Sequence, residues 1–235
     1  MAETGRGAFT ALGKDNGRAY YEFVRNLPLD GSTPEKGEYY EAVHFGVKSI
    51  QQRLVDLDYD RFVRGTFVVD GVFDRRTRRM VKKYQEANGI YVSGSVGPTT
   101  AAHLFGTYVH EAAQAFKWDY SYLYGIMKQE SAGDPGAQGW LTPGDRGIFQ
   151  INTLVHDTTP EQAHDFVYAT DWTCAFFQDA WKRYKGKGEE LRVNCSIAKH
   201  NNPSAADQWF ETGVAPYEGI QKYVSSVLSF AATAP

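Results

Sequence analysis

The sequence contains little cysteine and no long apolar run, and these two absences exclude whole classes of protein. Only two of its 235 residues are cysteines, Cys174 and Cys195, which are too few for a disulfide framework and lack metal-ligand spacing. We expect two reduced thiols in the core, with a disulfide between them as the less favoured alternative. No apolar segment approaches the roughly 20 residues that a membrane-spanning helix needs, so no membrane insertion is expected.

An excess of positive charge is also missing. The formal net charge is −3, whereas nucleic-acid-binding proteins usually carry a basic surface, so no nucleic-acid partner is expected. The six histidines are scattered and no HExxH motif occurs, so neither a metal nor another cofactor is expected. The first residues, MAETGRGAFTALG, lack the basic and apolar segments of a secretory signal, which predicts synthesis in a cytoplasm.

The length and composition favour a folded chain of two domains. The apolar fraction of 42% is enough for a hydrophobic core, and 235 residues exceed the usual size of one domain. We expect the chain to be a monomer. Residues 1–43 contain turn signals such as Asp15-Asn16-Gly17 but no steady periodicity, which predicts an irregular lead-in segment.

Three helices are predicted in residues 44–106. The first follows from helical spacing of apolar residues from Val47 onward. The second is expected to begin after an acidic N-cap, Asp74, and to end at Asn88-Gly89, and a third, short helix should begin at Pro98. The apolar residues expected on their buried faces are Val47, Ile50, Leu54, Leu57, Met80, Val81, Tyr84, Ala87, Ala101, Ala102, Leu104 and Phe105.

Two turns in this region repeat one pattern. The segment DGVFD at residues 70–74, followed by Thr77, is echoed by SGSVG at residues 93–97, followed by Thr100, which predicts a domain of duplicated units. The runs VKSIQQRLVDLDY, DGVFDRRTRRMVKKYQEANGI and SGSVGPTTAAHLF resemble the peptidoglycan-binding module found beside many cell-wall hydrolases. The resemblance covers residues 44–106 and implies bacterial peptidoglycan as the binding partner.

The rest of the chain, residues 107–235, is predicted to be helical as well, so the expected fold class is mainly α. Its helical periodicity is broken by glycine, proline and asparagine, and the central stretch is irregular. We therefore expect a small three-helix domain followed by a larger all-α domain.

Glu130 lies on the apolar face of a predicted helix in this second domain. That face is defined by Tyr122, Leu123, Ile126 and Met127, and Glu130 follows at the next helical step. The carboxyl is expected to point inward near the helix C-terminus, where burial and the helix dipole both favour its protonated form. A protonated carboxyl at neutral pH can serve as a general acid.

The segments after Glu130 resemble the catalytic domain of soluble lytic transglycosylases and goose-type lysozymes. Glu130-Ser131 matches the Glu-Ser pair that closes a helix in these families, and GIFQI at residues 147–151 matches the segment that lines their cleft. The resemblance implies a lysozyme-like fold with Glu130 as the catalytic acid. It also implies that Ser131, Gln150 and Ile151 contact the substrate, Gln150 through acetamido or hydroxyl groups.

Two further segments match less closely. In SIAKHNNP, which aligns with a third family segment that faces the cleft, His200 stands where the family usually has tyrosine. By the resemblance, His200 lies near the Glu130 carboxyl and Asn201 contacts substrate, although a shift of one residue would move His200 away. The segment YEGIQKYVSSVLSF resembles the last helix of the family, in which Tyr223 would point back toward the site. A plain core tyrosine is the equally favoured alternative.

The number of carboxylates separates two reactions on the bond between N-acetylmuramic acid and N-acetylglucosamine. A lytic transglycosylase uses one Glu and leaves a 1,6-anhydro end, whereas most glycosidases use two carboxylates. Asp134, before a proline, is expected to form a turn. Asp145 resembles the goose-type lysozyme residue that positions water. We favour the transglycosylase over the lysozyme, and treat a zinc amidase or an inactive wall-binding protein as weaker alternatives.

The pairing of a wall-binding module with a wall-cutting domain, and no apparent export signal, suggests a phage endolysin. Such a protein is made in the host cytoplasm and acts on the bacterial cell wall to cause host-cell lysis. A virion-associated lysin, or a bacterial enzyme exported by another route, is the alternative.

Overall fold

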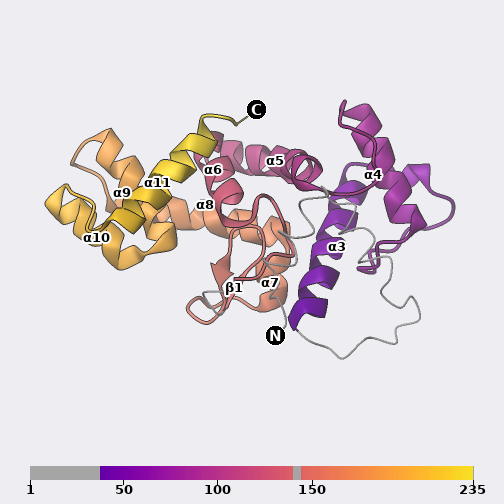
Figure 1. Cartoon of the computed structure of the whole chain (residues 1–235), viewed down its shortest axis with the longest axis horizontal. Coiled ribbons are helices and arrows are strands. Elements are labelled where there is room, and N and C mark those ends of the chain that lie inside the picture. Colours follow the sequence, from indigo (N-terminus) through magenta and orange to yellow (C-terminus); the bar gives the residue numbers. More distant parts are fainter. Residues whose placement is uncertain (1–37, 140–143, 235) are drawn as a thin grey trace. The chain divides into compact units, whose positions relative to one another are not determined.

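The computed structural model describes residues 38–139 and 144–234, which are mainly helical (Figure 1). The predicted fold class is confirmed. Most of the expected lead-in, residues 1–37, lies outside the described residues. The rest of that segment is not irregular, because the first described helix, α3 (Glu38–Asp56), begins well before Val47.

The chain divides into two compact units. Of the described residues, the first unit comprises 38–106, 131–139 and 144–169, and the second comprises 107–130 and 170–234. The first unit contains α3, a short 3₁₀ helix η1 (Tyr59–Phe62), α4 (Arg75–Ala87), β1 (Asp145–Arg146), β2 (Ile151–Asn152) and α7 (Pro160–His164). The second contains α9 (Glu189–Asn201), α10 (Pro203–Thr212), α11 (Glu218–Ala231) and all but the last residue of α6 (Tyr120–Ser131). Two helices, α5 (Pro98–Ala115) and α8 (Phe166–Arg183), contribute to both units.

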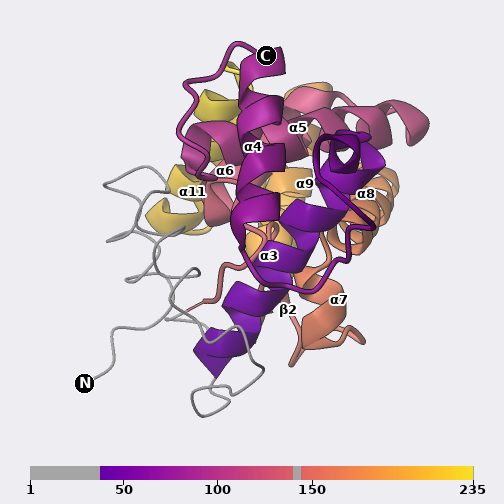
Figure 2. The ribbon, with the colours of Figure 1, turned by 90° about the vertical axis from the view of Figure 1, so that its right-hand side faces the viewer.

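Helices α3 and α4 pack against each other in the first unit (Figure 2). Helix α4 begins as predicted, because the Asp74 side chain accepts hydrogen bonds from the backbone amides of Arg76 and Thr77. Most of the predicted apolar residues are buried. Ala87, however, is exposed at the end of α4. Leu57, beyond the end of α3, and Ala102 are only half-buried.

Each of the two repeated turns is held by a buried glutamine. The Gln51 side chain donates to Thr77 Oγ1 at 3.0 Å and accepts from the Gly71 amide at 2.8 Å. In the second copy, the Gln85 side chain donates to Thr100 Oγ1 at 3.0 Å and accepts from the Gly94 amide at 2.8 Å. The two turns that repeat in the sequence therefore also repeat the same hydrogen bonds.

The two glycines of these turns have matching backbone conformations. Gly71 has φ 75° and Gly94 has φ 77°, in the left-handed region that favours glycine. In this conformation the backbone amide of each glycine donates to a glutamine side-chain oxygen, Gly71 to Gln51 Oε1 and Gly94 to Gln85 Oε1. The glycine and the glutamine of each copy thus stabilise the turn together.

The prediction of a short third helix is wrong. Helix α5 has 18 residues and runs from Pro98 to Ala115, because its alanine-rich sequence contains no proline after the first position and tolerates Gly106. The residues around His110, expected to start the second domain, are the second half of this helix. The compact units therefore divide the chain differently from the two predicted domains.

The segment from Ser131 to Ala169 packs with α3 in the first unit. Ser49 of α3 donates a hydrogen bond to the backbone carbonyl of His164 at 2.9 Å, and the rings of Phe45 and His164 stack. The rings of Phe105 and Phe166 are also in contact, with centroids 4.9 Å apart. These contacts join a stretch of the predicted catalytic domain to the preceding helices.

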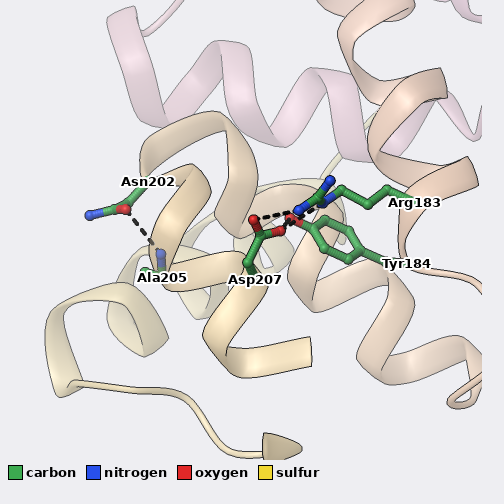
Figure 3. A network of polar contacts seen from close by, with 5 residues as sticks. All are labelled: Arg183, Tyr184, Asn202, Ala205 and Asp207. Carbon is green, nitrogen blue, oxygen red and sulfur yellow. Dashed lines mark hydrogen bonds and ion pairs between the residues drawn. The ribbon is translucent and has the colours of Figure 1, made fainter. Parts of the chain in front are cut away.

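Helices α9, α10 and α11 form a group within the second unit (Figure 1). The corner between α9 and α10 is fixed by two polar contacts (Figure 3). Asn202 caps α10 by accepting from the Ala205 amide at 3.0 Å, and Asp207 of α10 accepts a forked pair of bonds from Arg183, at 2.8 and 2.7 Å. Tyr184 adds a third bond to Asp207. The end of α9 is thereby held in a fixed direction.

Cys174 and Cys195 are both free and buried, so the predicted reduced thiols are confirmed. Burial raises the pKa of Cys174 to about 12 and that of Cys195 to about 11. Within residues 38–139 and 144–234, none of the helices combines the length and the apolar character needed to cross a membrane.

Candidate active site

Glu130 lies in the last turn of α6, with a side chain that is 15% exposed. The apolar face that precedes it is built as predicted by Leu123, Ile126 and Met127, which are all buried. Tyr122, assigned to the same face, is only half-buried, because the first turn of α6 lies closer to solvent. The carboxyl is thus mostly enclosed but still reached by solvent.

Tyr223 of α11 brings its hydroxyl to the Glu130 carboxyl. The hydroxyl donates a hydrogen bond to Glu130 Oε1 at 2.5 Å across a separation of 93 residues. Burial, followed by the charge of Glu130 and this hydrogen bond, raises the pKa of Tyr223 well above its ordinary value. Tyr223 therefore stays a neutral donor, and Oε1 is the oxygen that it holds.

A glycine allows α6 and α11 to come this close. A Cβ at Gly125 would collide with the backbone carbonyl of Val227 on α11. The close approach also lets Ser226 donate to the Gln129 side chain at 2.5 Å. Gly125 is a site determinant that the sequence reasoning missed, although a glycine inside an apolar helical run is a visible signal of close packing.

His200 approaches the same carboxyl oxygen from the last turn of α9. Its Nδ1 lies 3.6 Å from Glu130 Oε1, and its side chain is 5% exposed. The rings of Phe176 and His200 form a T-shaped pair, with centroids 6.2 Å apart and planes at 84°. The structure thus brings together three of the predicted site residues, namely Glu130, His200 and Tyr223, from three helices of one unit.

Ser131 has a structural task in the first unit. Its hydroxyl donates to the Ile148 carbonyl at 2.7 Å and accepts from the amides of Gly133 and Asp134, each at 3.1 Å. These bonds tie the end of α6 to the segment that precedes β2. The Ser131 hydroxyl is thus buried and bonded to the backbone, and the predicted contact of Ser131 with substrate stays a prediction.

Gln150 and Ile151 also belong to the first unit. The Gln150 amide nitrogen donates to the carbonyls of Gly147 and Ala137, at 2.9 and 3.2 Å, and its backbone has φ 50°. The Gln150 side-chain nitrogen therefore shapes the loop, and the predicted contact of Gln150 with substrate stays a prediction. Ile151 is buried within the first unit, where its side chain packs in the core, and its predicted contact with substrate stays a prediction.

Asp145 forms part of the small hairpin of β1 and β2. It pairs with Asn152 in the antiparallel register, and its carboxylate accepts a hydrogen bond from the Asn152 side chain at 2.8 Å. Residues 140–143, shortly before Asp145 in the sequence, lie outside the described residues. Asp145 belongs to the first unit and Glu130 to the second.

Asp134 forms the turn that was predicted for it. Its carboxylate accepts from the Gly136 amide at 2.8 Å, and its carbonyl accepts from the Ala137 amide at 3.2 Å. The side chain is buried in the first unit. This burial raises the pKa of Asp134 to about 7, against the opposing effect of the Gly136 hydrogen bond.

The remaining predicted residue, Asn201, is exposed at the end of α9. Its neighbour Asn202 caps α10 and donates to the Tyr217 hydroxyl at 3.2 Å. Among the described residues, no group of three or more His, Cys, Asp or Glu side chains is placed to hold a metal ion.

Two known domain families match the chain. Residues 45–104 match the family described as a putative peptidoglycan binding domain, and residues 107–205 match the transglycosylase SLT domain. No curated protein matches the sequence. The second match includes Glu130 and His200 and ends before α11, so it does not include Tyr223.

Proposed function

From the premise that the SLT domain makes this chain a peptidoglycan lytic transglycosylase, we propose that Glu130 carries both proton transfers of the reaction. The domain cleaves the β-1,4 bond between N-acetylmuramic acid and N-acetylglucosamine. The observation that carries the proposal is the enclosed Glu130 carboxyl, with Oε1 held by the Tyr223 hydroxyl. Because Oε1 accepts this bond, the transferable proton resides on Oε2.

In the first step, Glu130 protonates the glycosidic oxygen as the bond from that oxygen to C1 of N-acetylmuramic acid breaks. The 2-acetamido group of the same sugar supports the positive charge at C1. The Tyr223 hydroxyl bond becomes stronger at this moment, because Glu130 acquires its negative charge as the proton leaves.

In the second step, the Glu130 carboxylate takes the proton from the C6 hydroxyl of the same sugar. The C6 oxygen then bonds to C1 and closes a 1,6-anhydro ring. Glu130 is returned to its protonated state, and no water is consumed. One carboxyl that first donates and then accepts a proton is sufficient for this sequence.

The alternative is a lysozyme in which Asp145 positions an attacking water. Against this, the Asp145 carboxylate is bonded to Asn152 within the hairpin, which gives it a structural role. The two schemes differ in the product, because water attack leaves a reducible sugar and ring closure does not.

The proposed domain boundaries, residues 44–106 and 107–235, assign wall attachment and bond cleavage to successive parts of the chain. The first family match supports binding to peptidoglycan. Attachment keeps the catalytic part at high local concentration near its polymeric substrate. We propose lysis of a bacterial host, as by a phage endolysin, as the biological role, and the pairing of the two functions supports it.

Glu130→Gln and Asp145→Asn test the assignment as a pair. Muropeptide release from purified peptidoglycan should fall at least a thousandfold in Glu130→Gln, since glutamine cannot donate the proton. Asp145→Asn should keep the rate within about threefold. Glu211→Gln, an exposed change on α10, is the matched control. A large loss in Asp145→Asn with a normal melting temperature would favour the lysozyme.

A further inference from the structure

The two ring nitrogens of His200 lie in different surroundings. Nδ1 is 3.6 Å from Glu130 Oε1. Nε2 is buried and has no hydrogen-bond partner among the described residues. A buried polar atom without a partner requires an explanation, and here the explanation concerns the position of the ring proton.

A neutral imidazole carries one N–H, on either nitrogen. An N–H at Nε2 would be a buried donor without an acceptor, which is costlier than a buried lone pair. An N–H at Nδ1 faces a carboxyl oxygen. The surroundings therefore select the tautomer in which Nδ1 carries the proton.

We propose that His200 is a positioning residue for Glu130, which acts as a second donor to Oε1 through its Nδ1–H. This inference rests on the proposed role of Glu130. With Tyr223 and His200 both directed at Oε1, the carboxyl cannot exchange its two oxygens, and Oε2 is kept for the proton transfers. The distance of 3.6 Å shortens as Glu130 becomes charged, since catalytic hydrogen bonds tighten along the reaction.

The neighbours of His200 restrict its ring. Phe176 of α8 packs edge-on against the ring, and Lys199 of α9 holds its ammonium 4.7 Å from the centre of the same Phe176 ring. The Asn202 cap and the Asp207 clamp fix the corner that follows His200. The titratable group that faces the imidazole directly is Glu130, while Tyr223 bonds the same carboxyl oxygen and Lys199 lies over the neighbouring Phe176 ring.

Substitution of His200 by asparagine or by glutamine distinguishes the roles of its two ring nitrogens. In His200→Asn the amide nitrogen occupies the place of Nδ1, and in His200→Gln it occupies the place of Nε2. We expect His200→Asn to keep kcat on peptidoglycan strands within about threefold of the wild type. We expect His200→Gln to lose about tenfold to a hundredfold in kcat, with KM unchanged, because one donor to the reacting carboxyl is lost.

The tautomer is measured directly by the ¹⁵N chemical shifts of the His200 ring in the full chain. The expected spectrum has the proton on Nδ1. A proton on Nε2 would overturn the proposal, and so would equal losses in the two variants with melting temperatures near that of the wild type. Activity retained by Glu130→Gln would instead refute the proposed function, so the two failures are distinguishable.

Discussion

Each unit contains a set of buried polar side chains, and the two sets differ in how many of their polar atoms are hydrogen-bonded. The first set is the pair of turn glutamines, and the second is the cluster around Glu130. The Gln51 and Gln85 side chains are neutral, and each both donates to and accepts from its own turn. In the group around Glu130, a carboxyl meets a tyrosine hydroxyl and an imidazole whose Nε2 is unpartnered among the described residues. Satisfied neutral groups stabilise a fold, whereas an ionisable, partly satisfied group retains reactivity.

This difference predicts that substitutions in the two sets have opposite effects on stability and on reaction rate. Removing a glutamine should lower the free energy of unfolding and leave the chemistry intact. Removing a partner of Glu130 should lower the rate and leave stability nearly intact. The variants below test this separation.

The largest effect on stability is expected for Gln85→Leu. The change leaves the Gly94 amide and the Thr100 hydroxyl buried without their partner, which should cost about 3 kcal/mol. Denaturant unfolding measures the loss. Gln52→Leu is the control, because Gln52 is exposed and its side chain bonds Asp56 on its own helix, so its cost should stay below about 0.5 kcal/mol. Equal losses of stability in Gln85→Leu and Gln52→Leu would show that the bonds of Gln85 do not stabilise the turn.

The sequence predicted the repeat but not the glutamines that hold it. The turn pattern with Gly71 and Gly94 is local and therefore visible along the chain. Gln51 and Gln85 precede their turns by 20 and 9 residues, so the alignment of turns alone does not point to them. Hydrogen bonds between elements depend on the packing of α3 and α4, which periodicity does not specify.

The next effect is expected for Asp134→Asn, which should stabilise the chain at alkaline pH. Because the pKa of Asp134 is raised to about 7 in the fold, against about 3.9 when unfolded, ionisation costs stability as pH rises from about 4 to 7. The full cost is present above pH 7. Asparagine keeps the acceptor for the Gly136 amide without the charge.

The full pKa difference corresponds to about 4 kcal/mol, and relaxation around the charge should leave about 2 kcal/mol of it. Unfolding of both proteins at pH 8 and pH 3.5 measures the gain, which should disappear at the lower pH because Asp134 is then protonated in both states. A gain of the same size at both pH values would show that the charge is not its cause.

Tyr223→Phe is expected to lower kcat about tenfold, equivalent to about 1.4 kcal/mol of transition-state stabilisation. Only the hydroxyl that bonds Glu130 Oε1 is removed, so the melting temperature should change little. Muropeptide release under saturating peptidoglycan measures the rate. Tyr217→Phe, at an exposed residue before α11, is the control. A stability loss larger than the rate loss would place Tyr223 among the structural residues instead.

The smallest effect is expected for Asp207→Asn. The forked bond from Arg183 lowers the pKa of Asp207, so its stabilisation is present above the ordinary Asp pKa of about 3.9 and is lost as pH falls through the folded value. Because the pair is exposed, the loss at pH 7 should be about 0.5 kcal/mol. A larger loss in activity than in stability would indicate that the corner after His200 governs catalysis.

The candidate site was only partly accessible from the sequence. Helical spacing placed Glu130 on the inward face of α6, because that relation is local. The meeting of Glu130 with Tyr223 depends on the close approach of α6 and α11 at Gly125, which is a property of packing. Ser131 and Ile151 were assigned to the substrate by resemblance, whereas their side chains are buried in the first unit.

The most direct test of the single-carboxyl mechanism is the mass of the product end released from purified peptidoglycan. We expect an N-acetylmuramic acid end that is lighter than the hydrolysis product by one water and is not reduced by borohydride. A reducible end of the hydrated mass would contradict ring closure by Glu130 and would establish water attack.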